Sequence, residues 1–253
     1  MIPLVVRPEP QATSLSQALL AAGHQPVVSP LLSFVEGVEL DRLPALLADL
    51  SARDYVIAVS VQAVNFADNA LKQQGSSWPD AHYIAVGEAT GNAFDSVGVP
   101  GATVPDDPRS EGVISLPELR QLTGRRVVIL RGNGGRHLIA PTLMQAGALV
   151  DYCEVYRRHY HPDPNGTLVK SWQSQGVDSI IITSGGLLNH LVQLTATSAR
   201  DWLTSRLLIV PSIRVALEAR ELGFTQVINA EGASNQALID ALDERKRNDR
   251  QDR

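Results

Sequence analysis

The chain has 253 residues, a length that fits one or two domains. Hydrophobic residues make up 44% of it and aromatic residues only 5%, so the core must consist mainly of aliphatic side chains. The net charge of −5 argues against a protein that coats nucleic acid, and the single cysteine excludes an internal disulfide framework and a thiolate zinc site. No apolar run approaches the roughly 18–20 residues that span a bilayer, and the N-terminus lacks the features of an export signal. We therefore expect a cytoplasmic globular protein with two lobes.

Short apolar runs alternate along the chain with stretches of helical spacing. Most of these runs are unbroken, which is typical of strands in a parallel sheet that is covered on both faces. The expected strands are residues 4–6, 26–28, 55–59, 83–86, 127–130, 150–152, 180–183, 207–210 and 226–228. The alternation predicts an α/β fold with parallel sheets flanked by helices. Residues 243–253 carry no apolar side chain, and we expect them to form a disordered tail.

The two halves of the sequence match each other without a gap when one is shifted by 124 residues, the separation of Arg7 and Arg131. Landmarks of several kinds coincide in this register. The coinciding pairs include Leu19 with Leu143, Gly23 with Gly147, Ser60 with Ser184, Val86 with Val210, and Ser110 with Ser234. Such a register predicts a duplicated α/β unit.

Candidate ligand-binding residues follow the expected strands, because ligands of open α/β sheets bind beyond the carboxyl ends of the strands. Helix N-termini at these points attract carboxylates and phosphates through their unpaired N–H groups. Ser60 and Ser184 are equally consistent with plain helix caps and with capping residues that also bind an anion. The glycines of residues 131–136 expose backbone N–H groups beside Arg131 and Arg136, which suits an anionic ligand.

Other site classes are poorly supported. The dinucleotide fingerprint fails at its third glycine, where His137 stands, and the Gly-Lys-Ser/Thr of a phosphate loop is absent. The pair His159 and His161 lacks a nearby acidic or cysteine partner, so we expect no metal site. No Gly-x-Ser-x-Gly elbow supports a hydrolase.

Taken in order, a series of short motifs resembles the uroporphyrinogen-III synthase family of the bacterial type. They are Arg7-Pro8, Pro30-Leu31, Ser60-x-x-Ala63-Val64, Ala85-Val86-Gly87 with Thr90, Ser110-Glu111-Gly112, Ile129-Leu130-Arg131-Gly132-Asn133-Gly134-Gly135-Arg136, Gly147, Glu154-x-Tyr156-x-Arg158 and Thr183-Ser184-Gly185. The resemblance covers almost the whole chain. Two departures are Val59, where a Thr-Ser pair is common, and Arg214, which occupies the repeat position of Thr90.

The resemblance implies a reaction without cofactor or metal. The linear tetrapyrrole hydroxymethylbilane, which carries eight carboxylates, would lose its hydroxyl as water, and its last ring would invert as the macrocycle closes to uroporphyrinogen III. Tyr156 is the candidate for assisting departure of the hydroxyl, with a packing role as the equal alternative. The candidate substrate-binding residues are Arg7, Ser60, Gly87, Thr90, Arg131, Gly132, Asn133, Gly134, Arg136, Ser184, Gly185 and Ser212. We expect a monomer with a small-molecule substrate and with neither nucleic-acid nor membrane partners.

The family architecture implies two lobes joined by two antiparallel hinge strands, here residues 31–34 and 155–160. Lobe one would comprise residues 1–34 and 160–253, and lobe two residues 35–159. The competing class is a two-lobed, non-catalytic protein that binds a small anionic molecule. Such a sensor would be expected to carry an export signal or a DNA-reading helix pair, and the sequence contains neither.

Overall fold

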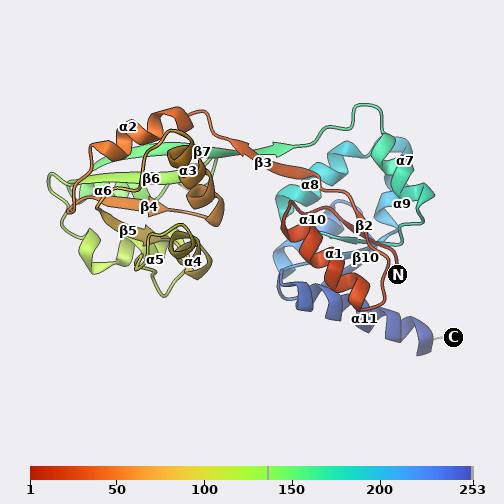
Figure 1. The fold of residues 1–253 in the computed structure, drawn as a ribbon. Coiled ribbons are helices and arrows are strands. Elements are labelled where there is room, and N and C mark those ends of the chain that lie inside the picture. Colours follow the sequence, from red (N-terminus) through yellow and green to blue (C-terminus); the bar gives the residue numbers. More distant parts are fainter. Residues whose placement is uncertain (136, 252–253) are drawn as a thin grey trace. The chain divides into compact units, whose positions relative to one another are not determined.

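The computed structural model describes residues 1–135 and 137–251, except for the side chains of residues 246–251. The chain divides into two compact units (Figure 1). Unit 1 comprises Met1–Ser33 and His159–Arg253, and unit 2 comprises Phe34–Arg158. Within the described residues no helix combines the length and the apolar character needed to cross a membrane.

Unit 1 contains a five-stranded sheet of order β10-β9-β8-β1-β2, in which each pair of neighbours is parallel. Its strands are β1 (Pro3–Val5), β2 (Val27–Val28), β8 (Ser179–Ile181), β9 (Leu207–Val210) and β10 (Gln226–Asn229). Its helices are α1 (Gln11–Ala21), α7 (Thr167–Ser174), α8 (Gly185–Leu194), η3 (Thr197–Ala199), α9 (Arg200–Thr204), α10 (Ile213–Glu221) and α11 (Asn235–Gln251).

Unit 2 contains a five-stranded sheet of order β3-β7-β6-β4-β5. Its strands are β3 (Leu32–Glu36), β4 (Tyr55–Ala58), β5 (His82–Ala85), β6 (Arg126–Gly132) and β7 (Leu149–Tyr160). Its helices are η1 (Leu40–Arg42), α2 (Leu43–Ala48), α3 (Val61–Gln73), α4 (Glu88–Ser96), α5 (Ser110–Ser115), η2 (Pro117–Leu119) and α6 (Ile139–Gln145). The pairs formed by β4, β5, β6 and β7 are parallel.

The strands that connect the units, β3 and β7, are antiparallel neighbours. His161 N–H donates to the Leu31 carbonyl at 3.0 Å, and Gly37 N–H donates to the Val155 carbonyl at 3.0 Å. As the residue number rises from 31 to 37 along the first segment, the number of its hydrogen-bonding partner falls from 161 to 155, which defines an antiparallel pair. The expected antiparallel hinge strands are therefore present.

Alternate residues of β4 explain why its sequence is an unbroken apolar run. Val56 and Ala58 belong to a core cluster with side chains of α2, α3 and α4, whereas Tyr55 and Ile57 belong to a second cluster with α5 and α6. Helices thus cover both faces of this sheet, as predicted, and every position of the strand is buried.

The duplication is visible in the strand order. Under the 124-residue shift, β9-β8-β1-β2 of unit 1 corresponds to β5-β4-β6-β7 of unit 2. Even the outermost position is represented in unit 2, where Thr103 forms an isolated parallel bridge with Ile84 beside β5. The α/β fold with two parallel-sheet lobes is therefore confirmed.

Two local expectations were wrong. Residues 150–152 and 155–160 were expected as separate strands, but they form one twelve-residue strand, β7, because β6 pairs with it as far as Tyr156. The backbone of residues 243–251 is helical and continues α11, where we expected a disordered tail; residues 252 and 253 of that tail lie outside the described residues. This segment contains Glu, Arg and Lys, which favour helices, and it extends a helix that is anchored by buried Leu238 and Leu242.

Candidate functional site

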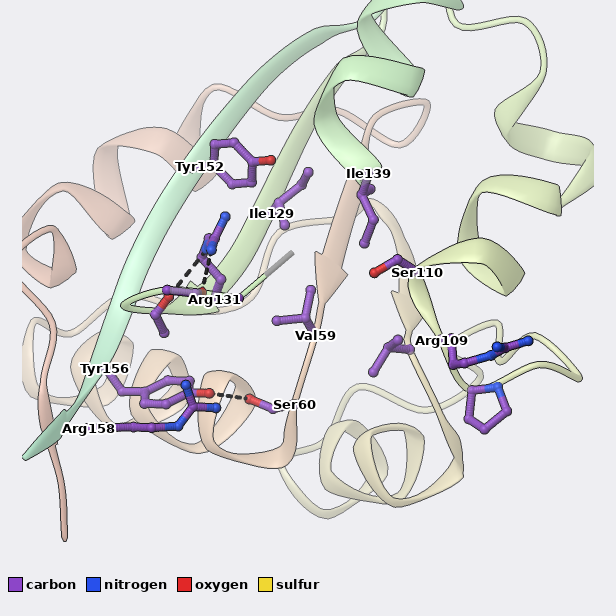
Figure 2. A pocket seen from close by; sticks show the side chains of 15 residues that line it. Val59, Ser60, Arg109, Ser110, Ile129, Arg131, Ile139, Tyr152, Tyr156 and Arg158 are labelled. Atoms are coloured by element: carbon purple, nitrogen blue, oxygen red, sulfur yellow. Dashed lines mark hydrogen bonds between the residues drawn. The ribbon is translucent and has the colours of Figure 1, made fainter. Parts of the chain in front are cut away.

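A cavity of about 330 Å³ opens in unit 2 at the carboxyl ends of β4, β5 and β6 and beside β7 (Figure 2). This is the edge at which parallel sheets bind ligands. The cavity is lined by Val59, Ser60, Val86, Pro108, Arg109, Ser110, Ile129, Arg131, Gly132, Gly134, Gly135, Ile139, Tyr152, Tyr156 and Arg158. Its wall combines aliphatic and aromatic side chains with hydroxyls and guanidinium groups, a mixture that suits an apolar ring bearing carboxylates.

Ser60 lies at the end of β4 and caps α3. Its extended backbone lets Oγ accept the Ala63 N–H at 3.2 Å, as expected for an N-cap. The same hydroxyl donates to the Tyr156 hydroxyl at 3.1 Å. One hydrogen of the two hydroxyls makes this bond, which leaves the second available to a bound ligand.

Tyr156 is 4% exposed and is held by aromatic neighbours. Phe34 of β3 meets its ring edge-on with the centroids 5.5 Å apart, and Phe66 of α3 stacks on it with the centroids 6.0 Å apart. The pairing of β6 with β7 shifts between Arg131 and Gly132, so Gly132 lies opposite Tyr156. Such a shift changes the direction of a side chain on a strand and is common beside active sites.

Gly132 provides the space for the phenol ring. A Cβ built on Gly132 would lie 2.5 Å from Cε2 and 2.9 Å from Cε1 of Tyr156, closer than atoms that are not bonded to each other approach. The glycine is therefore required here by the close approach of the ring, while its neighbours Gly134 and Gly135 adopt positive φ angles of 84° and 99°.

Arg131, which the sequence places among the substrate-binding candidates, lines the cavity and also donates hydrogen bonds to its own loop. Its side chain is 5% exposed; Nε donates to the Gly132 carbonyl at 3.2 Å, and Nη2 donates to the Gly134 carbonyl. The guanidinium also lies over the Tyr152 ring, 4.9 Å from its centroid. The charge of Arg131 faces the cavity, while its Nε and Nη2 donate to protein carbonyls. Arg136, also expected in the site, lies outside the described residues.

Three further expected residues do not line the cavity. Asn133 links the loop to β7: its N–H donates to the Tyr156 carbonyl at 3.1 Å, and its Oδ1 accepts the Arg158 N–H at 2.8 Å. Gly87 is the N-cap residue of α4, and Thr90 is buried in the first turn of that helix. Asn133 thus positions Tyr156 and Arg158 without itself lining the cavity.

The expected residues of unit 1 follow the strands of its own sheet. Ser184 caps α8 by accepting the Leu187 N–H at 3.3 Å, and Ser212 caps α10 by accepting the Val215 N–H at 3.5 Å. Arg7 follows β1 and donates to Asn235 Oδ1 at 3.2 Å, and burial lowers the pKa of its guanidinium. Gly185 is the first residue of α8 and lies close to the carboxylate of Glu218. A Cβ built on Gly185 would lie 2.7 Å from Glu218 Oε2.

Four polar residues of the cavity were missing from the expected set: Arg109, Ser110, Tyr152 and Arg158. Ser110 and Arg158 belong to motifs that carried the family resemblance, and Arg158 stands two residues from Tyr156 on one strand. Side chains two residues apart on a strand share a face, and this signal was available in the sequence. Across the described part of the chain, no group of three or more His, Cys, Asp or Glu side chains is placed to hold a metal ion.

Comparisons with known proteins agree with the motifs. The family described as uroporphyrinogen-III synthase HemD matches residues 13–240. Uroporphyrinogen-III synthase of Salmonella typhimurium is 40% identical over 242 residues, and that of Escherichia coli is 39% identical over 245 residues. Each match covers 94% of this chain and 98% of the relative.

Solved structures share the fold at lower identity. A uroporphyrinogen III synthase from Thermus thermophilus has a TM-score of 0.62 at 18% identity, covering 96% of this chain and 100% of that chain. The enzyme from Helicobacter pylori has a TM-score of 0.56 at 16% identity, covering 94% and 96%. At these identities the likeness extends to the fold alone.

Proposed function

This chain belongs to the uroporphyrinogen-III synthase family, and from this membership we propose that it closes hydroxymethylbilane to uroporphyrinogen III with loss of water. The reaction class is that of a cyclising lyase. The non-catalytic binding protein that the sequence left open as an alternative is not retained, because the matching relatives are synthases.

The hydrogen bond from Ser60 to Tyr156 is the observation that carries the proposed chemistry. The lone pair of a pyrrole nitrogen supplies the electrons that expel the hydroxyl of the substrate. That hydroxyl leaves as water with a proton donated by the Tyr156 hydroxyl, and Ser60 stabilises the resulting phenolate through the existing bond. Ring closure then releases a proton from a pyrrole carbon, which restores the phenol. The sum is loss of one water from the substrate.

Orientation accounts for the rest of the catalysis. Without an enzyme, the linear tetrapyrrole closes with its last ring not inverted. The enzyme must therefore hold that ring in the inverted arrangement during attack. In unit 2, the carboxylates of the substrate would meet the guanidinium groups of the cavity and the N-terminus of α3. Within unit 1, we propose the capped N-termini of α8 and α10, together with Arg7, as positions that can bind carboxylates.

The direct test is incubation of the purified full-length chain with hydroxymethylbilane, followed by oxidation and chromatographic separation of the porphyrin isomers. Heat-denatured protein serves as the control for spontaneous closure. We expect isomer III with the native chain and isomer I with the control. Isomer I alone with native protein would contradict the proposed function.

A further inference from the structure

Three described arginines line the cavity of unit 2, and they differ in what their guanidinium groups contact. Arg131 donates to the carbonyls of its own loop. Arg109 donates from Nε and Nη2 to the two carboxylate oxygens of Asp107, each at 2.7 Å. The Arg158 guanidinium, by contrast, makes no hydrogen bond or ion pair with any residue among 1–135 and 137–251 for which side chains are described. Of these three cations, Arg158 is the one with all its donors available to a ligand.

The backbone of Arg158 is fixed even though its side chain is exposed. Its N–H donates to Asn133 Oδ1 at 2.8 Å, and the N–H of Asn133 donates to the Tyr156 carbonyl at 3.1 Å. The same asparagine therefore ties both residues of β7 to the glycine loop. Tyr156 and Arg158 alternate on the strand and share a face, and Figure 2 shows both side chains extending from β7 on the side of Ser60.

We propose that Arg158 binds a carboxylate of the substrate ring that bears the departing hydroxyl, and so presents that hydroxyl to Tyr156. This inference rests on the proposed function and assigns a positioning residue to it. A guanidinium offers two parallel N–H donors that match the two oxygens of a carboxylate, and a residue two positions from the acid fixes the ring at short range. Asp107 already occupies the fork of Arg109, so Arg109 is less suited to this task.

The test compares Arg158→Gln and Arg158→Lys with Arg157→Gln in the full-length chain. Arg157 is the adjacent arginine on β7; it is exposed, lies outside the cavity lining and donates to the Glu36 carbonyl at 3.1 Å. Loss of a charge-assisted bidentate contact should raise KM for hydroxymethylbilane about 10- to 100-fold in Arg158→Gln. Lysine keeps the charge but not the fork, so Arg158→Lys should recover part of that loss. Arg157→Gln should keep the KM of the unaltered chain, and all three variants should keep its melting temperature.

A substrate change separates a direct contact from a general effect of charge. An analogue with methyl esters in place of the carboxylates on the ring that bears the departing hydroxyl should bind the unaltered chain less tightly than hydroxymethylbilane. Arg158→Gln should bind the analogue and hydroxymethylbilane nearly equally. An unchanged KM in Arg158→Gln, or an equal rise in Arg157→Gln, would overturn the assignment of Arg158 while leaving isomer III production intact. Failure of the unaltered chain to produce isomer III would instead count against the proposed function.

Discussion

The Ser60 hydroxyl donates a hydrogen bond to the Tyr156 hydroxyl at 3.1 Å, across 96 positions of sequence. It joins the N-terminus of α3 to β7 at the point where the pairing of β7 with β6 shifts. The cap of a helix and the candidate proton donor are therefore one hydrogen-bonded unit, and changes to either residue should affect the other.

Tyr156→Phe removes the hydroxyl and keeps the ring that packs between Phe34 and Phe66. If the phenol donates the proton, kcat should fall by roughly 10²–10⁴ while KM and the melting temperature stay close to those of the unaltered chain. The lower half of that range is expected, since the pyrrole supplies most of the driving force. Enzymatic product should remain isomer III, because binding geometry imposes the inversion. Steady-state kinetics with isomer analysis makes the measurement; a fully active variant would return Tyr156 to a packing role.

Ser60→Ala and Ser184→Ala form a matched pair, because both serines cap a helix after a strand of the duplicated unit. Each variant should lose about 0.5–2 kcal/mol of unfolding free energy with its cap. Ser60→Ala should also lose kcat, since the phenolate of Tyr156 loses its donor, whereas Ser184→Ala should mainly raise KM. Urea unfolding and kinetics measured on the same samples separate the two effects. Equal kcat values in the two variants would disconnect Ser60 from the chemistry.

Gly132→Ala tests the close approach of the Tyr156 ring. The added methyl group would overlap the ring, so the ring must move, at a cost of about 1–3 kcal/mol in unfolding free energy and with a fall in kcat. Gly232→Ala is the control, because its added Cβ would lie at an ordinary 3.6 Å from the Cβ of Ala237. Thermal unfolding and kcat should therefore be nearly unchanged in the control. A Gly132→Ala chain as stable and active as the control would refute this account of the ring.

Asp54→Asn tests a buried carboxylate that connects the start of β4 to β6. Burial raises the pKa of Asp54, but hydrogen bonds from the N–H of Arg126 and from Ser51 outweigh it, so the pKa is lowered on balance. A lowered folded-state pKa stabilises the protein above the unfolded value of about 3.9, and this contribution is lost as the pH falls through the folded value. At pH 7 the unfolding free energy of the unaltered chain should exceed that of Asp54→Asn by about 1–3 kcal/mol. The difference should shrink below about pH 4, as followed by urea unfolding over a pH series. A gap independent of pH would mean that the charge of Asp54 contributes nothing.

The sequence predicted features that depend on local pattern. Unbroken apolar runs identified the strands, and serines after those strands identified the caps at Ser60 and Ser184. The shift of 124 residues predicted the shared strand order of the two units. These features were predictable because burial on two faces and capping each require particular residue types at neighbouring positions.

Features that depend on the path of a loop were not predictable. The charge of Arg131 suggested a ligand contact, but the sequence did not predict that its Nε and Nη2 would also donate to the carbonyls of Gly132 and Gly134, whose positions follow from the conformations of the glycines. The continuity of β7 was missed because residues 153 and 154, which join the two expected strands 150–152 and 155–160, are held in the sheet by pairing with Leu130 and Arg131 of β6, more than twenty positions away. Arg158 belonged to a recognised motif, but its proposed role in binding substrate depends on the hydrogen bonds that Arg109 and Arg131 make within the protein.

The order of strands along the chain has a consequence for synthesis on the ribosome. Unit 2 is continuous over Phe34–Arg158, so it can fold as soon as that stretch has emerged. In unit 1, β1 pairs with β8 in the register Pro3 to Ser179, so the first strand to be translated waits for one translated long after it. During that interval the apolar β1 and β2 lack β8, the central strand of their sheet. The nascent chain thus completes its two units in the reverse of the order in which it begins them, and the apolar strands β1 and β2 are without β8 until unit 2 has been translated.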